Sequence, residues 1–316
     1  MSSYNIIPKV TVLMPAFNVE KYIAAAVNSV LNQTFTDFEL LIINDGSTDN
    51  TRKILEEFID QRLIIVNLNQ NKGVAYALNK GLKLAKGEYI ARFDADDICF
   101  PKRLSKQVSF LENNPEYILV GSDAEYVLET GEFMCNYYCK NHEYKEILKE
   151  RFKYCPFIHS AVMYKKKAVI DAGSYSVHAH NFEDHLLWVN LIKLGKCCNL
   201  NEPLIKVRFS SDSVTIDEKW RGSIFRKLKS DIIQRGSITE NEGQKILEII
   251  KKQENRKIKE GSYHALCSKK FLSDNYQPQK ARLHAQKAVA IHPFRADNYA
   301  LLLAGYLPKK IIDWIK

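Results

Sequence analysis

The sequence predicts an α/β fold, with a mainly parallel central sheet flanked by helices and a helical C-terminal region. Three observations lead to this prediction. Short apolar segments rich in β-branched residues alternate with helical patterns over residues 10–111. Polar and acidic residues gather where these segments end, which is where open α/β sheets bind their ligands. Beyond about residue 215 the strand patterns stop and helical spacing replaces them.

Four segments in the first part of the chain are mainly apolar, which predicts buried parallel strands. Helices are predicted after each of them, from apolar residues that recur three or four positions apart. The predicted strands are residues 10–14, 38–43, 63–66 and 88–93. The helices are marked by Ile23, Val27, Val30 and Leu31, with Asn18 as the cap; by Ile54, Leu55, Phe58 and Ile59; by Val74, Leu78, Leu82 and Ala85; and by Leu104, Val108 and Leu111, after Pro101.

The middle of the chain is mixed and the end is helical. Short strands are predicted near residues 118–120, 158–163 and 204–209, a helix over residues 183–194, and a helix pair over residues 280–291 and 299–303. The change of pattern places a domain boundary at residue 215. This predicts one domain of residues 1–215 and a basic helical region of residues 216–316.

The charge and the cysteine content indicate the cellular compartment of the protein. The formal net charge is +9, and residues 140–170 and 219–260 hold many of the lysines and arginines. Residues 216–260 combine these charges with Trp220 and other apolar side chains, so they either lie on an anionic membrane surface or pack on the first domain. The seven cysteines lack the spacing of a zinc site, and the sequence shows no secretory or membrane-spanning segment. These features predict a cytoplasmic protein, which could also attach peripherally to the inner face of the cell membrane.

The triplet Asp94-Ala95-Asp96 follows the predicted strand of residues 88–93. In an extended chain its two carboxylates would point to the same side and repel each other by roughly 3 kcal/mol at ~5 Å. Mg²⁺ or Mn²⁺ would remove this repulsion and stabilise a departing diphosphate. The alternative is that the acids of residues 94–97 only cap the helix that begins near Pro101.

Asp45 and Phe17 follow two other predicted strands and suit a nucleobase. The Asp45 carboxylate can accept a hydrogen bond from the ring N–H of uracil or thymine, whereas cytosine has an acceptor at that position. Phe17 offers a surface on which the base can stack. The alternatives are a simple turn at residues 44–47 and ordinary core packing of Phe17.

A series of motifs in this order resembles the inverting family-2 glycosyltransferases with a GT-A fold. The resemblance is dense from Val10 to Gln107 and covers about the first 215 residues. The motifs are Val10-Thr-Val-Leu-Met-Pro-Ala-Phe-Asn18, Asn44-Asp-Gly-Ser-Thr-Asp49, Asn71-Lys-Gly73 with Asn79, Ala91-Arg-Phe-Asp-Ala-Asp-Asp97, Phe157-Ile-His-Ser-Ala-Val-Met163 and Phe182-Glu-Asp-His-Leu-Leu-Trp188.

The resemblance implies roles for individual residues. Asp184 is implied as the general base that takes the proton of the acceptor hydroxyl. Relatives often have a histidine where this chain has Ser210, so that protein ligand of the metal is absent here. The resemblance further implies donor binding for Pro15, Phe17, Asp45, Arg92, Asp94 and Ala95, metal binding for Asp96 with Asp94, and the acceptor side for His159 and Glu183.

Together these inferences predict the transfer of a sugar, with inversion, from a UDP- or dTDP-sugar to a hydroxyl of a saccharide or lipid-linked saccharide, with Mn²⁺ or Mg²⁺ as cofactor. The resemblance implies a setting in surface polysaccharide or glycolipid synthesis. A sugar-1-phosphate nucleotidyltransferase is one alternative, but it would need a Gly-rich basic loop at residues 15–18. A nucleotide-sugar or glycan-binding module without catalysis is another. Nucleic acid is not predicted as a partner, because the basic residues do not interleave with an aromatic platform.

Overall fold

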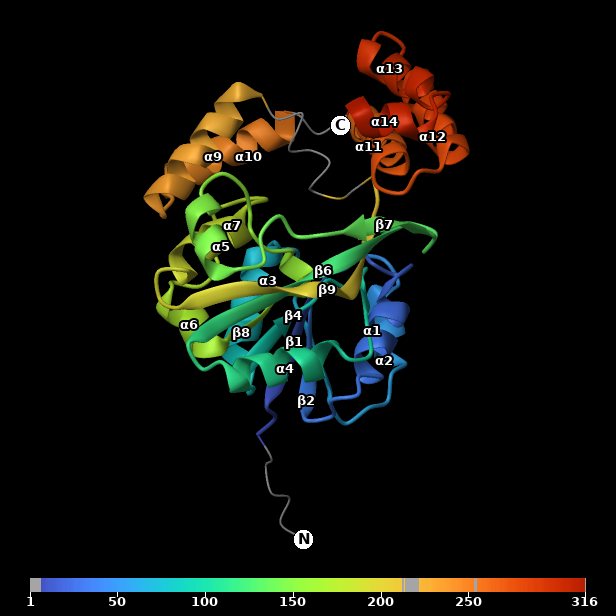
Figure 1. The fold of residues 1–316 in the computed structure, drawn as a ribbon. Helices are drawn as coiled ribbons and strands as arrows, with labels where there is room; N and C mark the ends of the chain where they lie inside the picture. The colour runs from blue at the N-terminus through green and yellow to red at the C-terminus, as the bar shows by residue number, and fades with distance from the viewer. Residues whose placement is uncertain (1–6, 212, 214–221, 253–254, 316) are drawn as a thin grey trace. The chain divides into compact units, whose positions relative to one another are not determined.

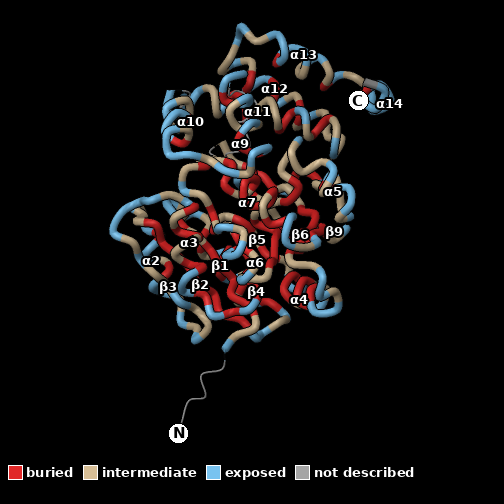
Figure 2. The backbone as a smooth tube through the Cα atoms, turned by 90° about the vertical axis from the view of Figure 1, so that its left-hand side faces the viewer, coloured by how far each residue is buried: buried red, intermediate tan, exposed pale blue. Residues whose placement is uncertain are grey.

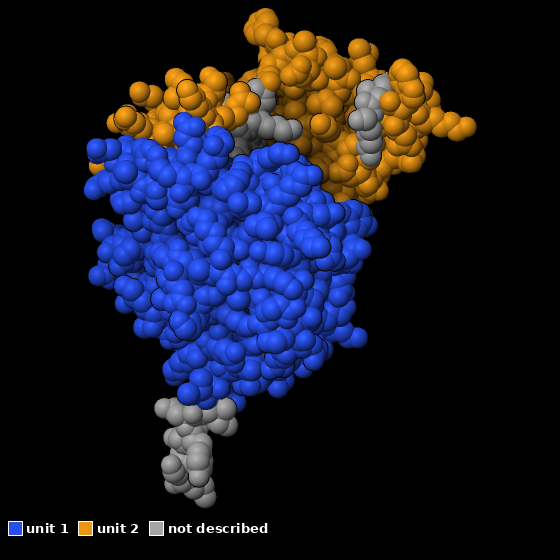
Figure 3. Space-filling model, turned by 60° about the vertical axis from the view of Figure 1, so that its left-hand side comes forward, with its two compact units in different colours: residues 1–124, 138–207, 229–243 blue, residues 125–137, 208–228, 244–316 orange. Residues whose placement is uncertain are grey.

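The computed structural model describes residues 7–211, 213, 222–252 and 255–315 (Figure 1). The chain forms two compact units (Figure 3). The first unit consists of residues 1–124, 138–207 and 229–243, and the second of residues 125–137, 208–228 and 244–316. The boundary expected at residue 215 stays a prediction. Trp220 lies outside the described residues.

The first half of the sheet is parallel, as predicted. β1 (Val10–Ala16) lies between β2 (Phe38–Asn44) and β4 (Tyr89–Arg92), and β3 (Leu63–Asn67) pairs with the far side of β2. β1, β2 and β4 are buried almost throughout, which explains their mainly apolar sequences, whereas β3 is partly exposed at the edge. Because the four strands run the same way, the loops that follow β1, β2 and β4 meet at one edge of the sheet.

The other half makes the sheet mixed. β8 (Met163–Lys165) pairs antiparallel with both β4 and β6 (Tyr117–Leu128), and β5 (Ile98–Cys99) pairs antiparallel with β9 (Lys196–Phe209). β7 (Phe133–Tyr137) pairs with β6 outside this path. The prediction of a strand over residues 158–163 is wrong for the residues before Met163, where β8 begins. His159–Ala161 form a 3₁₀ turn, in which the Ala161 amide donates to the Ile158 carbonyl.

Helices cover the sheet in the first unit, and buried backbone is concentrated along its strands (Figure 2). α3 packs on β1 and β2, and α1 on β5. Two details of the prediction are wrong. Asn18 does not cap α1, because Tyr22 is the N-cap, and Ile59 is fully exposed because α2 ends at Glu56. The helices are α1 (Ile23–Leu31), α2 (Thr51–Glu56), α3 (Val74–Leu84), α4 (Arg103–Asn113), α5 (Tyr144–Glu150), α6 (Lys166–Asp171) and α7 (Glu183–Leu191).

The described part of the chain after residue 221 is helical, as predicted. The expected pair is α12 and α13, which pack against each other and against α11. Phe225, Ile232 and Ile233 of α9 are buried, which favours packing over membrane contact for this segment. No helix among the described residues is long and apolar enough to span a membrane. The helices are α9 (Ser223–Arg235), α10 (Glu240–Lys252), α11 (Arg256–Ser273), α12 (Pro278–Ile291), α13 (Ala296–Ala304) and α14 (Lys309–Ile315).

Candidate active site

Hydrogen bonds join the loops that follow β1 and β2. The Asp45 amide donates to the Ala16 carbonyl at 2.8 Å. Asn18 has a φ of 51° and accepts from the Thr48 amide at 2.8 Å through its side-chain oxygen, while its own amide donates to Ser47 Oγ at 3.0 Å. The side chain of Asn18 therefore bridges two loops at the sheet edge, which explains why it does not cap α1.

Asp45 is fixed by the backbone in front of α3. The Lys72 amide donates to Asp45 Oδ1 at 2.9 Å and the Gly73 amide to Oδ2 at 2.8 Å. Burial raises the pKa of Asp45, and these two bonds oppose the rise. Gly46 permits the close approach of the two loops, because a Cβ there would lie 2.5 Å from the carbonyl carbon of Gln70. Each carboxylate oxygen keeps a lone pair for a further donor.

Phe17 is the first residue after β1 and is 42% exposed. It is therefore not an ordinary core residue, and its ring keeps free surface next to the Asp45 loop. Pro15 lies at the same end of β1, opposite Ile43 of β2. The structure thus brings Pro15, Phe17 and Asp45 to one end of two neighbouring strands.

The acidic triplet forms a turn after β4. β4 ends at Arg92, and the Asp97 amide donates to the Asp94 carbonyl at 3.3 Å. The expectation that Asp94 and Asp96 share a side of an extended strand is therefore wrong, since the turn sets their directions. Neither residue caps α4, whose N-cap is Lys102. The capping alternative is therefore wrong, and both acids lie in the turn that follows β4.

Arg92 connects the acidic turn with the rest of the site. Its guanidinium is buried and forms an ion pair with the Asp94 carboxylate. Burial alone would lower the pKa of Arg92, but the charge and hydrogen bond of Asp94 raise it above its usual value. Within the described residues, Arg92 Nε is buried without a hydrogen-bond partner. The positive charge of Arg92 therefore compensates the negative charge of Asp94, and Arg92 Nε can donate a further hydrogen bond.

Asp184 lies in the first turn of α7, with its carboxylate held at both oxygens. The His185 amide donates to Asp184 Oδ1 at 2.6 Å, and the Cys155 thiol donates to Oδ2 at 3.3 Å. Burial, and then the charge of Asp184, raises the pKa of Cys155 well above its usual value. Cys155 is therefore a protonated thiol at neutral pH and a hydrogen-bond donor to Asp184.

Glu183 precedes Asp184 and is nearly buried. Burial, and then the charge of Asp184, raises its pKa to about 7. The charge of Arg92 lowers this pKa and that of Asp94 raises it, so both groups lie within electrostatic reach of Glu183. The start of α7 and the turn after β4 therefore belong to one electrostatic environment.

His159 belongs to an aromatic cluster around Trp188. Its Nε2 lies 3.1 Å from the Tyr175 hydroxyl, and its ring centroid lies 5.8 Å from that of Trp188. Burial, and then the charge of Arg92, holds the pKa of His159 well below its usual value. Asn79 fixes Tyr175 through two hydrogen bonds to its backbone, of 2.7 and 3.1 Å. His159 is thus neutral and tied into this network.

One short segment contacts both halves of the site. Cys155 donates to Asp184, and Ser160 Oγ accepts from the Asp94 amide at 3.0 Å. Five residues of extended chain span at most ~18 Å, so the two aspartates are anchored to the same small region. The convergence of the carboxylates on one cleft stays a prediction.

The acids after β4 suit a metal that is bound together with a substrate. Asp94 and Asp96 offer hard carboxylate oxygens, which Mg²⁺ and Mn²⁺ prefer. Among the described residues no group of three or more His, Cys, Asp or Glu side chains forms a metal cage. Ser210 stands in place of the family's histidine, and its amide donates to Ser213 Oγ at 3.0 Å. Mg²⁺ commonly uses one or two carboxylates plus phosphate oxygens, and the residues present fit that mode.

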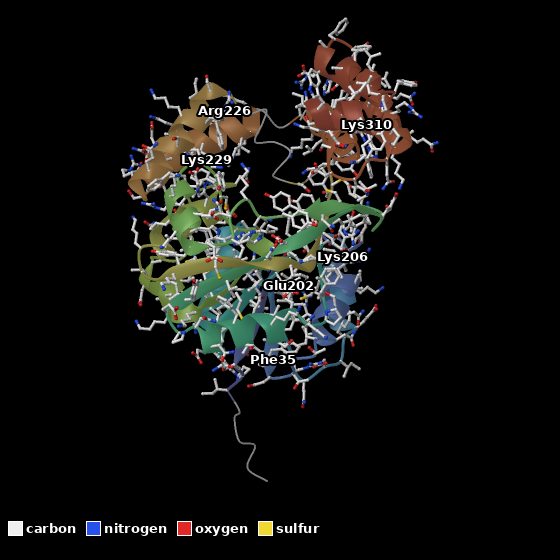
Figure 4. The ribbon with its side chains drawn as sticks, in the orientation of Figure 1. Phe35, Glu202, Lys206, Arg226, Lys229 and Lys310 are labelled. Atoms are coloured by element: carbon white, nitrogen blue, oxygen red, sulfur yellow. The ribbon has the colours of Figure 1, made fainter. Side chains whose placement is uncertain are left out.

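Sequence reasoning missed side chains that contact the predicted site residues. Cys155, Ser160 and Tyr175 contact Asp184, Asp94 and His159, respectively, and none of the three carried a role predicted from the sequence. Lys229 of α9 was assigned only to a basic helix, yet its ammonium lies 5.7 Å from the ring centroid of Phe182, just before the Glu183-Asp184 pair (Figure 4). The motif at residues 157–163 marked this region, but only three-dimensional contacts identify the individual side chains.

A shallow pocket of about 430 Å³ lies between α4 and β9, away from these residues. Lys106 and Glu202, which line it, form an ion pair with each other. The pocket contains none of the acids after β4 or at the start of α7. We assign no function to it.

Curated proteins with similar sequences are named as glycosyltransferases. The model of the family described as glycosyl transferase family 2 matches residues 11–173. The amylovoran biosynthesis glycosyltransferase AmsE of Erwinia amylovora is 33% identical over 66% of this chain and 80% of its own. The UDP-Glc:alpha-D-GlcNAc-diphosphoundecaprenol beta-1,3-glucosyltransferase WfgD of Escherichia coli is 29% identical over 73% of this chain and 87% of its own. The crystal structure of S. aureus TarS 1-349 in complex with UDP-GlcNAc superposes with a TM-score of 0.56 over 98% of this chain and 92% of its own. The sequence identity is 17%, so the likeness shows a shared fold.

Proposed function

This chain belongs to glycosyltransferase family 2 and has the GT-A fold, and on this premise we propose that it transfers a sugar with inversion from a UDP- or dTDP-sugar to a hydroxyl of a saccharide. As a family-2 enzyme it uses a nucleotide sugar to build a polysaccharide or glycolipid. The observation that carries the proposal is the contact of residues 155–160 with both Asp94 and Asp184.

The end of β1 and β2 binds the nucleotide in this proposal. The base stacks on Phe17, whose ring is partly exposed, and its ring N–H donates to a free lone pair of Asp45. Pro15 and Ala95 line the same side. WfgD is named for a UDP-sugar donor and the TarS structure contains UDP-GlcNAc, which supports a uridine nucleotide here.

Asp94 and Asp96 are the residues that would hold Mn²⁺ or Mg²⁺. The ion would supply positive charge to the diphosphate leaving group. Arg92 fixes the direction of the Asp94 carboxylate through their ion pair. Its buried Nε is a further donor on this side of the site.

Asp184 is the general base. It takes the proton of the acceptor hydroxyl while that oxygen attacks the anomeric carbon opposite the departing diphosphate, which inverts the configuration. Asp184 lies in the first turn of α7, next to the positive end of the helix dipole. The Cys155 thiol and the His185 amide hold the carboxylate in one orientation. Glu183 lies beside it on the acceptor side.

We infer a saccharide acceptor carried on a lipid. WfgD is named for an acceptor linked to diphosphoundecaprenol, and 87% of its length matches this chain. Such an acceptor places the reaction at the cytoplasmic face of a membrane.

Nucleotide release tests the proposed function. The purified protein is incubated with a panel of UDP- and dTDP-sugars, Mn²⁺ and saccharide acceptors, and free UDP or dTDP is measured. We expect metal-dependent release from one donor. Thermal stabilisation by UDP, about 2.7 kcal/mol at a hundred times the Kd, should disappear with a chelator. UDP binding without release from any donor would favour the binding module, and formation of a nucleotide sugar from a nucleoside triphosphate would favour the nucleotidyltransferase.

A further inference from the structure

Exposed apolar side chains are concentrated in the last two helices. Tyr299, Leu303 and Tyr306 recur at spacings of four and three along α13 and its end, so they share a side. Ile311 and Trp314 are three positions apart on α14. We call the α13–α14 surface the set Phe294, Tyr299, Leu303, Tyr306, Ile311 and Trp314, all of them exposed, with Trp314 at 86% and Leu303 at 68%.

The opposite side of the same helices is well packed. Ile312 is buried in a cluster with Tyr263, Cys267 and Phe271 of α11, and Leu301 and Leu307 pack against it. The helices are therefore held in place by one face and present apolar side chains on the other. An apolar surface of this kind marks an interaction site when a partner complements it.

Positive charge accompanies the α13–α14 surface. Residues 278–316 contain seven lysines and arginines and two aspartates, a balance of +5. Lys310 is exposed on α14 and forms no ion pair within the described residues (Figure 4). The Arg282 guanidinium lies 4.7 Å from the ring centroid of Tyr306 and donates to the Gly305 carbonyl at 2.7 Å.

We propose that the α13–α14 surface docks on an anionic lipid membrane. Tyr and Trp rings next to lysines are the combination that proteins place at the membrane–water interface. α13 has nine residues, ~14 Å of helix, so it lies in the interface and does not cross a hydrocarbon core of ~30 Å. A second copy of the chain would bring like charges together, whereas anionic headgroups attract them.

This inference deepens the proposed function, because a lipid-linked acceptor is presented at a membrane. The proposed membrane contact lies at α13 and α14 and not at residues 216–260. In that segment the apolar residues of α9 are largely buried, with Ile224 the exposed exception. The docking surface is instead a folded pair of helices near the end of the chain.

Vesicle flotation of the full chain tests the proposal. Vesicles of phosphatidylcholine with and without phosphatidylglycerol are used at low and high salt. We expect binding only to the anionic vesicles, weakened by salt. The triple variant Leu303→Ser/Tyr306→Ser/Trp314→Ser should reduce the partition coefficient at least tenfold, since it removes the inserted side chains. Lys310→Gln should reduce it about fivefold, the effect of one basic charge near an anionic surface.

Matched controls lie on the first unit. Ile59 is fully exposed and Lys53 is an exposed lysine. Ile59→Ser and Lys53→Gln therefore remove an exposed apolar side chain and a positive charge outside the α13–α14 surface, and they should leave vesicle binding unchanged. The proposal is overturned if the wild type does not bind, if the triple variant binds equally well, or if light scattering shows a dimer that the triple variant breaks. UDP release with a soluble acceptor is measured in parallel. Its failure in every variant would reject the proposed function without deciding the docking.

Discussion

The proposed donor side, around Asp45, and the proposed base side, around Asp184, are built in different ways. Asp45 follows a strand directly and is held by backbone amides of a neighbouring loop. Asp184 is held by the side chain of Cys155, 29 residues away, and Tyr175, which contacts His159, is fixed by Asn79, 96 residues away. Sheet topology therefore sets the donor side, whereas packing between distant segments sets the base side. Substitutions on the two sides should separate donor binding from turnover.

The largest effect on the donor side is expected for Asp96→Asn. The loss of a metal ligand should remove the Mn²⁺-dependent stabilisation by UDP and lower turnover by about a thousandfold, roughly 4 kcal/mol of transition-state stabilisation. Thermal shift with UDP and nucleotide release measure the two effects. Asp171→Asn, on the exposed end of α6, is the matched control. Unchanged metal-dependent UDP binding in Asp96→Asn would contradict the donor-side assignment.

On the base side, Glu183 should make stability depend on pH. Its folded pKa of about 7 lies above the ordinary 4.5, so the folded protein retains a proton that the unfolded chain has lost. The stability from this group is therefore complete below pH 4.5 and is lost as the pH rises to about 7. Glu183→Gln should be more stable than the wild type at pH 8 by about 3 kcal/mol, with a smaller difference at pH 5.

Urea unfolding at the two pH values measures this difference. Glu57→Gln, at an exposed position after α2, should show no such dependence. An equal difference between Glu183→Gln and the wild type at both pH values would show that the Glu183 carboxyl is not perturbed in the folded protein.

A smaller effect is expected for the thiol that holds the base. Cys155→Ala should lower kcat about tenfold, the value of one hydrogen bond to a charged group, while the affinity for UDP stays the same. Cys155→Ser restores a donor and should recover most of the activity. Cys198→Ala removes another buried thiol and controls for stability. If Cys155→Ala has the kcat of the wild type, the thiol does not position Asp184.

The smallest effect is expected for Phe17→Ala. Loss of a stacking surface should weaken UDP binding about fivefold, or ~1 kcal/mol, with little change in kcat at saturating donor. Phe133 has nearly the same exposure, 41% against 42%, so Phe133→Ala is a matched control that should bind UDP normally. Isothermal titration gives both affinities. Equal UDP affinity in both variants would remove Phe17 from the donor site.

The same contrast explains what the sequence could predict. The four parallel strands were predicted because their sequences are mainly apolar, and strand direction predicts that the acids after them lie at one edge of the sheet. The turn at Asp94–Asp97 was not predicted, because alternation applies only while the chain stays extended. The partners of Asp184 were not predicted either, since a contact between Cys155 and a helix 29 residues later leaves no local pattern. The family motifs marked these regions without showing which side chains touch.

The central claim is that Asp184 and the acids after β4 serve one site with separate tasks. The most direct measurement is kcat, together with UDP affinity in the presence of Mn²⁺, for Asp184→Asn. We predict that turnover falls by ~10³-fold, within the range of a lost general base, while UDP binds as in the wild type. Full activity in Asp184→Asn, or loss of UDP binding with kcat intact, would contradict the claim.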